Sequence, residues 1–176
     1  MITQIQKLLS CPFVVLSGIA AISALSLASA LTAEVALGLE PCILCLYQRI
    51  PFLLALLVSL AGLVLCKIKK EKKAGIAITL IGLCGALFLT NSAIALYHSG
   101  VELHWWKSAV EGCAVPNFGD EPQSILENIL SAPTARCDEI PWADPIFDLS
   151  MANYNVLLCF GLFVVCLISV FKIKSR

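Results

Sequence analysis

Four long apolar stretches constrain this chain more than any other feature of its sequence. They run approximately over residues 11–31, 45–66, 74–97 and 154–171. A helix needs about 20 mainly apolar residues to cross ~30 Å of hydrocarbon, and lipid offers no hydrogen-bond partner to a free backbone amide. Only 14% of the residues are charged, against about a quarter in soluble domains. We therefore predict an all-α membrane protein, a bundle of four transmembrane helices that forms one integral membrane domain over residues 1–176.

The basic residues predict the orientation of this bundle. Nine of the twelve Lys and Arg fall on one side of the predicted spans. They are Lys7, the five lysines of segment 67–73, Lys172, Lys174 and Arg176. Because Lys and Arg accumulate on the cytoplasmic side, both termini are expected in the cytoplasm. Segments 32–44 and 98–153 then form the outward, periplasmic loops.

The first span has an alternative interpretation. Lys7, the apolar run and Ala28-Ser29-Ala30 also resemble a signal peptide with a cleavage site. The run is long for a signal peptide, so we favour an uncleaved span. Cleavage would leave the topology of the other three helices unchanged.

The longer outward loop contains the pattern of a short amphipathic helix. Glu121-Pro122 is a helix start with proline in the first turn. The apolar residues that follow on one face are Ile125, Leu126, Ile129 and Leu130. Such a helix lies on the membrane surface or packs on the protein's own core, and the sequence leaves both arrangements open.

Cys42 and Cys45 form a C-x-x-C pair at the start of the second span. Two intervening residues allow a reversible disulfide, and the partial positive charge of a helix N-terminus favours the thiolate that attacks in exchange. The alternative is half of a zinc site, which needs two further ligands. The candidates are His98, His104, Cys113 and Cys137. We favour redox chemistry and expect no metal.

Arg49 follows Cys45 by four residues and Cys42 by seven, so the three side chains share one helical face. It lies about 6 Å deeper than Cys45 along the axis, at ~1.5 Å per residue. An arginine at that depth is costly unless it reaches the interface or finds a partner. Arg49 is therefore either an interfacial anchor or a cation that stabilises a thiolate or an anionic reduced cofactor.

Cys113 and Cys137 lie 24 positions apart in the longer outward loop. Outside the cytoplasm the default state of such a pair is a disulfide. A purely structural disulfide closing this loop would contribute about 3 kcal/mol in the chain-entropy model. Because a second dithiol is predicted on the same face of the membrane, we favour an exchangeable disulfide.

The other five of the nine cysteines lie within the spans or at their cytoplasmic ends. They are Cys11, Cys66, Cys84, Cys159 and Cys166. Free cysteine behaves there as a small apolar residue, so no role is assigned to them.

His98 and three tryptophans mark the outer membrane surface. His98 begins the longer outward loop, where it either donates a hydrogen bond to a carbonyl or caps the preceding helix. The tryptophans are predicted to belong to the aromatic belt of the interface. They are Trp105, Trp106 and Trp142.

Several of these segments together resemble the disulfide bond formation protein B (DsbB) family of bacterial inner membranes. They are Pro41-Cys42-x-x-Cys45-x-x-Gln48-Arg49, Tyr97-His98-Ser99-Gly100-Val101-Glu102, Trp105-Trp106, the two loop cysteines, Pro141-Trp142 and the motif of residues 149–155. The resemblance covers nearly the whole chain, and the combination is specific.

The resemblance implies a protein-disulfide:quinone oxidoreductase of the inner (cytoplasmic) membrane, with its site facing the periplasm. A reduced thioredoxin-fold partner, similar to DsbA, would attack the loop disulfide and form a mixed disulfide at Cys113. The freed Cys137 would attack Cys42. Cys45 would then leave as a thiolate and pass electrons to a bound quinone, either ubiquinone or menaquinone.

The resemblance also implies which residues hold the quinone. Arg49 and His98 match the family's quinone-site arginine and histidine, together with Cys45. The sequence contains no nucleotide motif, no haem C-x-x-C-H and no iron–sulfur spacing, which fits a lipid-soluble acceptor. The expected partners are therefore the DsbA-like oxidase, the quinone and the bilayer, and not a nucleic acid.

Three other functions remain open at this point. The first is a four-helix quinone oxidoreductase similar to vitamin K epoxide reductase. The second is a protein that imports reducing power through membrane cysteines such as Cys84 and Cys159. The third is a four-span scaffold whose loops carry structural disulfides or a metal, without enzymatic activity.

Overall fold

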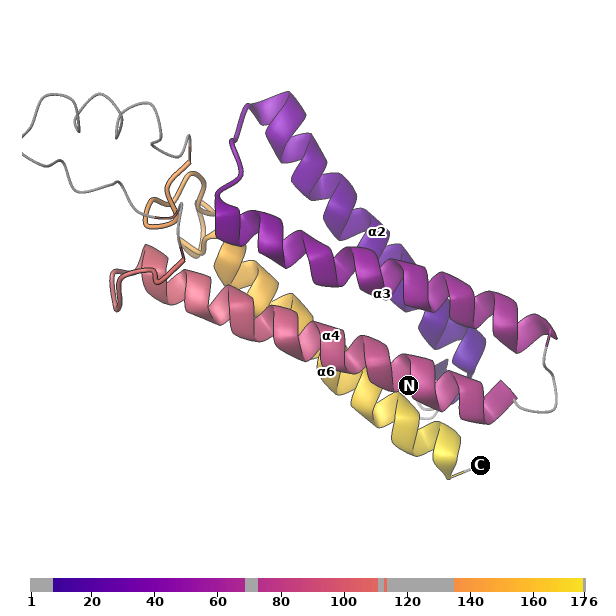
Figure 1. Cartoon of the computed structure of the whole chain (residues 1–176). Helices are drawn as coiled ribbons and strands as arrows, with labels where there is room; N and C mark the ends of the chain where they lie inside the picture. Colours follow the sequence, from indigo (N-terminus) through magenta and orange to yellow (C-terminus); the bar gives the residue numbers. More distant parts are fainter. Residues whose placement is uncertain (1–7, 69–72, 111–112, 114–134, 176) are drawn as a thin grey trace, which may run out of the picture.

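The computed structural model describes residues 8–68, 73–110, 113 and 135–175, which are dominated by four long helices (Figure 1). They are α2 (Pro12–Leu37), α3 (Ile43–Ile68), α4 (Lys73–Glu102) and α6 (Met151–Lys174). Each is long and apolar enough to cross a membrane, with mean hydropathies between 1.8 and 2.7 over the best window. The predicted all-α bundle of four membrane-spanning helices is confirmed. The predicted amphipathic helix at residues 121–130 lies outside the described residues.

The helices extend beyond the spans that hydropathy marked. α2 continues to Leu37, and α4 continues through His98 to Glu102. Hydropathy detects the part of a helix that suits lipid, whereas backbone hydrogen bonding continues into polar turns beyond it. As a result, His98 belongs to the last turns of α4 and is held by helical backbone.

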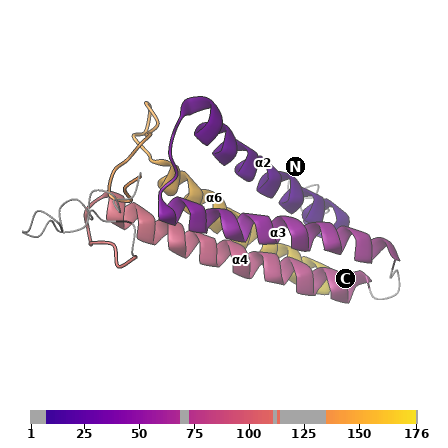
Figure 2. The same cartoon turned by 45° about the horizontal axis from the view of Figure 1, so that its top comes forward.

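α4 lies between α3 and α6, and α2 packs on α3 (Figure 1). Figure 2 shows the same arrangement from another side, and in both views α2 diverges from α3 toward its C-terminal end. Gly38 ends α2 in the left-handed conformation, at φ 65°, and its N–H donates to the carbonyl of Ala33. The axes of α2 and α3 are therefore farther apart at the end where α3 begins than at the other end.

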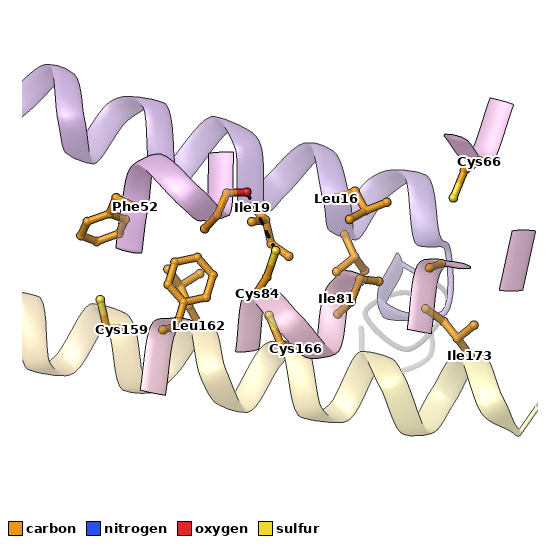
Figure 3. Close-up of a cluster of buried hydrophobic side chains, with 14 residues drawn as sticks. Leu16, Ile19, Phe52, Cys66, Ile81, Cys84, Cys159, Leu162, Cys166 and Ile173 are labelled. Carbon is orange, nitrogen blue, oxygen red and sulfur yellow. Dashed lines mark hydrogen bonds between the residues drawn. The ribbon is translucent and has the colours of Figure 1, made fainter. Parts of the chain in front are cut away.

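The centre of the bundle is a continuous apolar core (Figure 3). Phe52 and Phe88 meet edge to face, with ring centroids 6.1 Å apart. Cys84 and Cys166 are buried among these side chains. Cys84 donates its thiol toward the carbonyl of Ala55, at 3.9 Å. These cysteines act as small core residues, in line with the sequence analysis.

An aromatic pair fixes the chain where it leaves α4. The Trp106 ring stacks on Tyr97 with centroids 6.0 Å apart, and its Nε1 donates to the Tyr97 carbonyl at 3.1 Å. The Tyr97 hydroxyl accepts the Ala109 N–H at 2.8 Å. These contacts fold residues 103–110 back against α4 and lead the chain toward Cys113.

Candidate dithiol and disulfide site

Cys42 precedes the first residue of α3, and Cys45 lies in its first turn. Both are free thiols, and their Sγ atoms are 2.9 Å apart in a shared hydrogen bond. The Cys42 Sγ also accepts the Cys45 backbone N–H at 3.3 Å, in the manner of a helix N-cap. The C-x-x-C pair thus lies where the unpaired amides of a helix start favour a negative sulfur.

The surroundings of Cys42 favour its thiolate. The hydrogen bond with the Cys45 thiol lowers the pKa of Cys42 well below that of an ordinary thiol, although burial acts in the opposite direction. A hydrogen bond from His98 lowers this pKa further. Because the thiolate is the nucleophile and the better leaving group in exchange, Cys42 is prepared for disulfide chemistry.

His98 reaches the dithiol from α4 and is buried, with 3% of its surface exposed. Its Nε2 lies 3.5 Å from the Cys42 Sγ and 3.7 Å from Glu102 Oε1. Its Nδ1 lies 2.9 Å from the Gln48 side-chain nitrogen. Taken alone, the residues suggested that His98 bonds a membrane-surface carbonyl or caps a helix, and the family resemblance suggested a place at the quinone site. The structure places the imidazole directly against the Cys42 sulfur.

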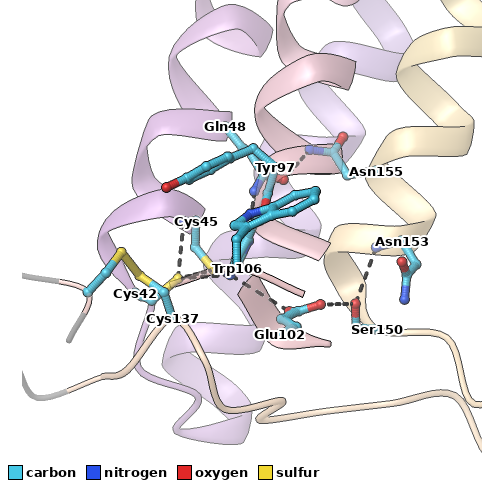
Figure 4. Close-up of polar contacts among 12 residues, drawn as sticks. Cys42, Cys45, Gln48, Tyr97, Glu102, Trp106, Cys137, Ser150, Asn153 and Asn155 are labelled. Atoms are coloured by element: carbon cyan, nitrogen blue, oxygen red, sulfur yellow. Dashed lines mark hydrogen bonds and ion pairs between the residues drawn. A yellow bond between two sulfur atoms is a disulfide. The ribbon is translucent and has the colours of Figure 1, made fainter. Parts of the chain in front are cut away.

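Glu102 is a buried carboxylate beside this imidazole. Its Oε2 accepts the Ser150 hydroxyl at 2.5 Å, and Ser150 also caps α6 by accepting the Asn153 N–H at 3.2 Å (Figure 4). The start of α6 and the end of α4 are therefore tied together beside the dithiol. Sequence reasoning did not single out Glu102 or Ser150, although both lie within the motifs that carry the family resemblance.

Cys113 and Cys137 form a disulfide. Both are buried, in a cluster that also contains Cys42, Leu44 and Val101, and Cys45 packs against this cluster. In Figure 4 the disulfide of Cys137 lies beside the dithiol. The two cysteine pairs that the sequence singled out are thus brought together, although residues 46–112 separate them in the chain.

Arg49 lies on the same face of α3 as the dithiol, as predicted, and it has a partner that the sequence did not reveal. Its Nη1 donates to Glu34 Oε2 of α2 at 2.8 Å. The two side chains are 23% and 39% exposed, so the pair is partly solvated. It bridges α2 and α3 in the region where the two helices diverge.

A cavity of about 1010 Å³ opens beside the dithiol, lined by residues of all four helices, of the connection between α2 and α3, and of the segment 135–142. Its lining includes Cys42, Cys45, Gln48, Arg49, His98 and Glu102. Four of the predicted site residues, Cys42, Cys45, Arg49 and His98, therefore face one cavity. Its volume is at the upper end of the ~300–1,000 Å³ that is usual for small-molecule sites.

The zinc alternative has three potential ligand atoms in the described residues. The sulfurs of Cys42 and Cys45 and a ring nitrogen of His98 lie within 4.8 Å of one another. A structural zinc site needs four ligands, and two of the predicted candidates, Cys113 and Cys137, are bonded to each other. The arrangement fits exchange between a dithiol and a disulfide better than a structural zinc site.

The fold and site define a class: a multi-pass helical membrane protein that holds a free dithiol beside a disulfide at one end of its bundle. The family profile described as "Disulfide bond formation protein DsbB" matches residues 13–169. The chain belongs to this family, and it is accordingly an oxidoreductase that acts in disulfide bond formation.

Individual relatives agree with the family match. A disulfide bond formation protein B of Histophilus somni is 33% identical over 159 residues, covering 86% of this chain and 84% of the relative. One of Haemophilus influenzae is 27% identical over 150 residues, covering 84% and 79%. An uncharacterized protein of Rickettsia prowazekii is 29% identical over 161 residues, covering 88% and 86%. No solved structure matches the chain.

Proposed function

We propose that this protein re-oxidises a periplasmic thioredoxin-fold thiol oxidase, similar to DsbA, and passes the electrons to a membrane quinone. The observation that carries the proposal is the position of Cys42, which packs in one buried cluster with the Cys113–Cys137 disulfide and also lines the large cavity. One sulfur therefore has access to both halves of a relay.

The first exchanges take two electrons from the partner. A thiolate of the reduced partner attacks the Cys113 sulfur, and Cys137 leaves as a thiolate. Cys137 then attacks Cys42 of an oxidised Cys42–Cys45 pair, and Cys45 leaves as a thiolate. Each step forms one S–S bond and breaks one, so that no further oxidant or reductant is needed.

The next exchanges release the oxidised partner. Its second thiolate attacks the partner sulfur that is bonded to Cys113, which frees Cys113 as a thiolate. Cys113 then attacks Cys137 in the Cys137–Cys42 bond, and Cys42 leaves as a thiolate. The loop disulfide is restored, and the two electrons now reside on Cys42 and Cys45. This is the combination of a disulfide and a dithiol that the structure contains.

The cavity fits a quinone in size and in its polar groups. A quinone, when bound, accepts two electrons and two protons and becomes a quinol. Cys45 lines the cavity, and the Arg49 guanidinium and the His98 imidazole offer N–H donors to a carbonyl oxygen. We propose that Arg49 and His98 orient the quinone and stabilise negative charge on it. Arg49 does so while paired with Glu34, which keeps the cation in place.

The proposed setting is the bacterial inner membrane, with the cavity at the periplasmic end of the bundle. Exchangeable disulfides persist in the oxidising periplasm and are rare in the cytosol. A DsbA-like partner is itself a strong oxidant, at about −120 mV. Its re-oxidation therefore needs an acceptor that is more oxidising still, and a lipid-soluble quinone reaches the cavity from the bilayer.

Quinone reduction by the purified protein in detergent, driven by the reduced partner, tests this function. Ser replacements of Cys42, Cys45, Cys113 and Cys137 are each expected to abolish turnover. Cys84→Ser, in the apolar core and away from the cavity, is the matched control and should retain it. Unchanged turnover in any of the four variants would refute the relay, and absence of turnover in the parent protein with either quinone type would refute the electron acceptor.

Cys113 is proposed as the point of entry. When the partner's second cysteine is replaced by Ser, its remaining thiolate can still attack the Cys113–Cys137 disulfide but cannot release itself afterwards, so a stable adduct with Cys113 should accumulate. Peptide mapping of that adduct identifies the bonded cysteine. An adduct at Cys42 or Cys45 instead would show that the partner bypasses the loop disulfide.

A further inference from the structure

A chain of side-chain hydrogen bonds runs from the dithiol into the bundle. Beyond the contact of His98 with Cys42, Gln48 Nε2 lies 2.9 Å from His98 Nδ1, and Asn155 Nδ2 donates to Gln48 Oε1 at 2.5 Å. Figure 4 shows Gln48 of α3 and Asn155 of α6 facing each other. Three helices thus contribute to one polar connection that ends at the redox sulfur.

The hydrogen bonds at the far end of this network orient the Asn155 amide. Asn155 Oδ1 accepts the Cys159 thiol at 3.1 Å, and the Cys159 sulfur accepts from Asn91 Nδ2 at 3.3 Å. Asn155 therefore presents its nitrogen, rather than its oxygen, to Gln48. Since Gln48 Oε1 is occupied by this donor, the Gln48 nitrogen faces His98.

This orientation decides which ring nitrogen of His98 carries its proton. An amide nitrogen only donates, so His98 Nδ1 accepts from Gln48 and the imidazole proton is on Nε2. The Glu102 carboxylate, 3.7 Å from Nε2, favours the same tautomer. The Nε2–H then points at the Cys42 sulfur, 3.5 Å away.

We propose that Gln48 is a positioning residue, which holds the Nε2–H tautomer of His98 and thereby directs a hydrogen-bond donor at the Cys42 sulfur. This inference deepens the proposed function and rests on it for its role in the cycle. The donor stabilises Cys42 as a thiolate when Cys42 leaves the Cys137–Cys42 bond. Without Gln48, the ring is free to place its proton on Nδ1 and to turn a lone pair toward the sulfur.

Other charged and titratable groups also face this part of the site. They are Cys45 and Arg49 of α3, Glu34 of α2, Glu40 between α2 and α3, Glu102 of α4, Tyr154 of α6, and Arg136 and Glu139 of the segment 135–142. The test must therefore separate an effect that passes through His98 from a general change in the local field. A double-mutant cycle with His98 makes that separation.

The test is the pH profile of alkylation of Cys42 in the reduced full-length protein, followed by mass spectrometry of the peptide that contains Cys42. The assay uses neither partner nor quinone, so its failure is distinguishable from failure of the proposed function. A hydrogen bond to a charged group is worth about 1.5–3 kcal/mol, or about one to two pH units. His98→Ala should raise the midpoint by that amount, and Gln48→Leu by about one unit.

Three further variants make the result specific. Gln48→Leu should add nothing in the His98→Ala background. Gln48→Glu replaces the amide donor at Nδ1 with an acceptor, which favours the proton on Nδ1, so it should raise the midpoint as Gln48→Leu does. Ser59→Ala, a buried site of the same helix whose hydroxyl donates to the Leu56 carbonyl, should not move it.

Two outcomes would overturn the proposal. One is a Gln48→Leu midpoint equal to that of the parent protein. The other is a shift of the same size with and without His98, which would show a structural effect that does not pass through the imidazole. If Gln48→Leu does not fold, Asn155→Ala releases the Gln48 amide without touching His98. It should raise the midpoint in the same direction, and an unchanged midpoint there also refutes the proposal.

Discussion

Replacement of Gly100 by alanine tests how the end of α4 holds the site. Gly100 lies between His98 and Glu102, and the Trp106 ring covers it. A Cβ at this position would overlap the Cζ2 and Cε2 atoms of the Trp106 ring. The indole is rigid and hydrogen-bonded to Tyr97, so it has to leave its place.

The cost follows from the contacts that Trp106 loses. Its Nε1 hydrogen bond to the Tyr97 carbonyl is worth about 1 kcal/mol net, and its stacking on Tyr97 about 1 kcal/mol. We therefore expect Gly100→Ala to lower the free energy of unfolding by about 2 kcal/mol relative to a neutral Gly→Ala change. For a chain of this size that corresponds to a Tm lower by about 4–8 °C.

The measurement is thermal unfolding of the detergent-solubilised protein, followed by near-ultraviolet circular dichroism of the tryptophans. Gly82→Ala is the matched control, because Gly82 lies on the same helix with no atom within 4 Å of its added Cβ. Alanine gains about 1 kcal/mol of helix propensity over glycine in both variants, so the difference between them isolates the clash. If both variants melt at the same temperature, Trp106 does not hold the end of α4 in the way described.

Three further predictions concern charges and caps around the site. Glu34→Gln should lower the free energy of unfolding by less than about 1 kcal/mol, because the Glu34–Arg49 pair is partly exposed; a loss above 2 kcal/mol in a denaturant titration would contradict this reading. The lowered pKa of Cys42 means that its thiolate persists as the pH falls. Its alkylation by iodoacetamide should thus hardly slow between pH 8 and pH 6, whereas a tenfold loss per pH unit would show an ordinary thiol. Ser150→Ala removes the cap of α6 and the partner of Glu102, so it should lower the free energy of unfolding by about 1–2 kcal/mol. Ser150→Thr keeps the hydroxyl and should retain most of that stability in the same titration.

The helices and the two cysteine pairs could be predicted from the sequence. Membrane spans can be predicted from hydropathy because few structures other than a helix satisfy the backbone hydrogen bonds within lipid. Cys42 and Cys45 stand at a spacing with a known chemical use, and Arg49 follows them at helical spacing. The structure adds that Cys42 lies in one buried cluster with the Cys113–Cys137 disulfide, and that Cys45 packs against this cluster.

The partners of these residues were not predictable from one sequence. Asn155 and Gln48 are 107 positions apart, and no local pattern pairs two amides over that distance. Glu34 appears in the sequence as one charge near the end of a span. Glu102 appears equally ordinary, and only the packing of α4 against α6 buries it beside His98. Side-chain networks between helices depend on helix rotation and tilt, which hydropathy does not determine.

The order of the proposed relay is supported by which sulfur touches which neighbour. Cys42 belongs to the buried cluster of the Cys113–Cys137 disulfide and also lines the cavity. Cys45 is more exposed than Cys42 and lines the same cavity. Cys113 and Cys137 are not among the residues that line the cavity, so the proposed relay takes electrons from the loop disulfide to Cys42 and then to Cys45. A direct transfer from the loop cysteines to a quinone would need a different packing of this cluster. In the proposed relay, Cys42 is therefore the residue that connects the loop disulfide with the quinone.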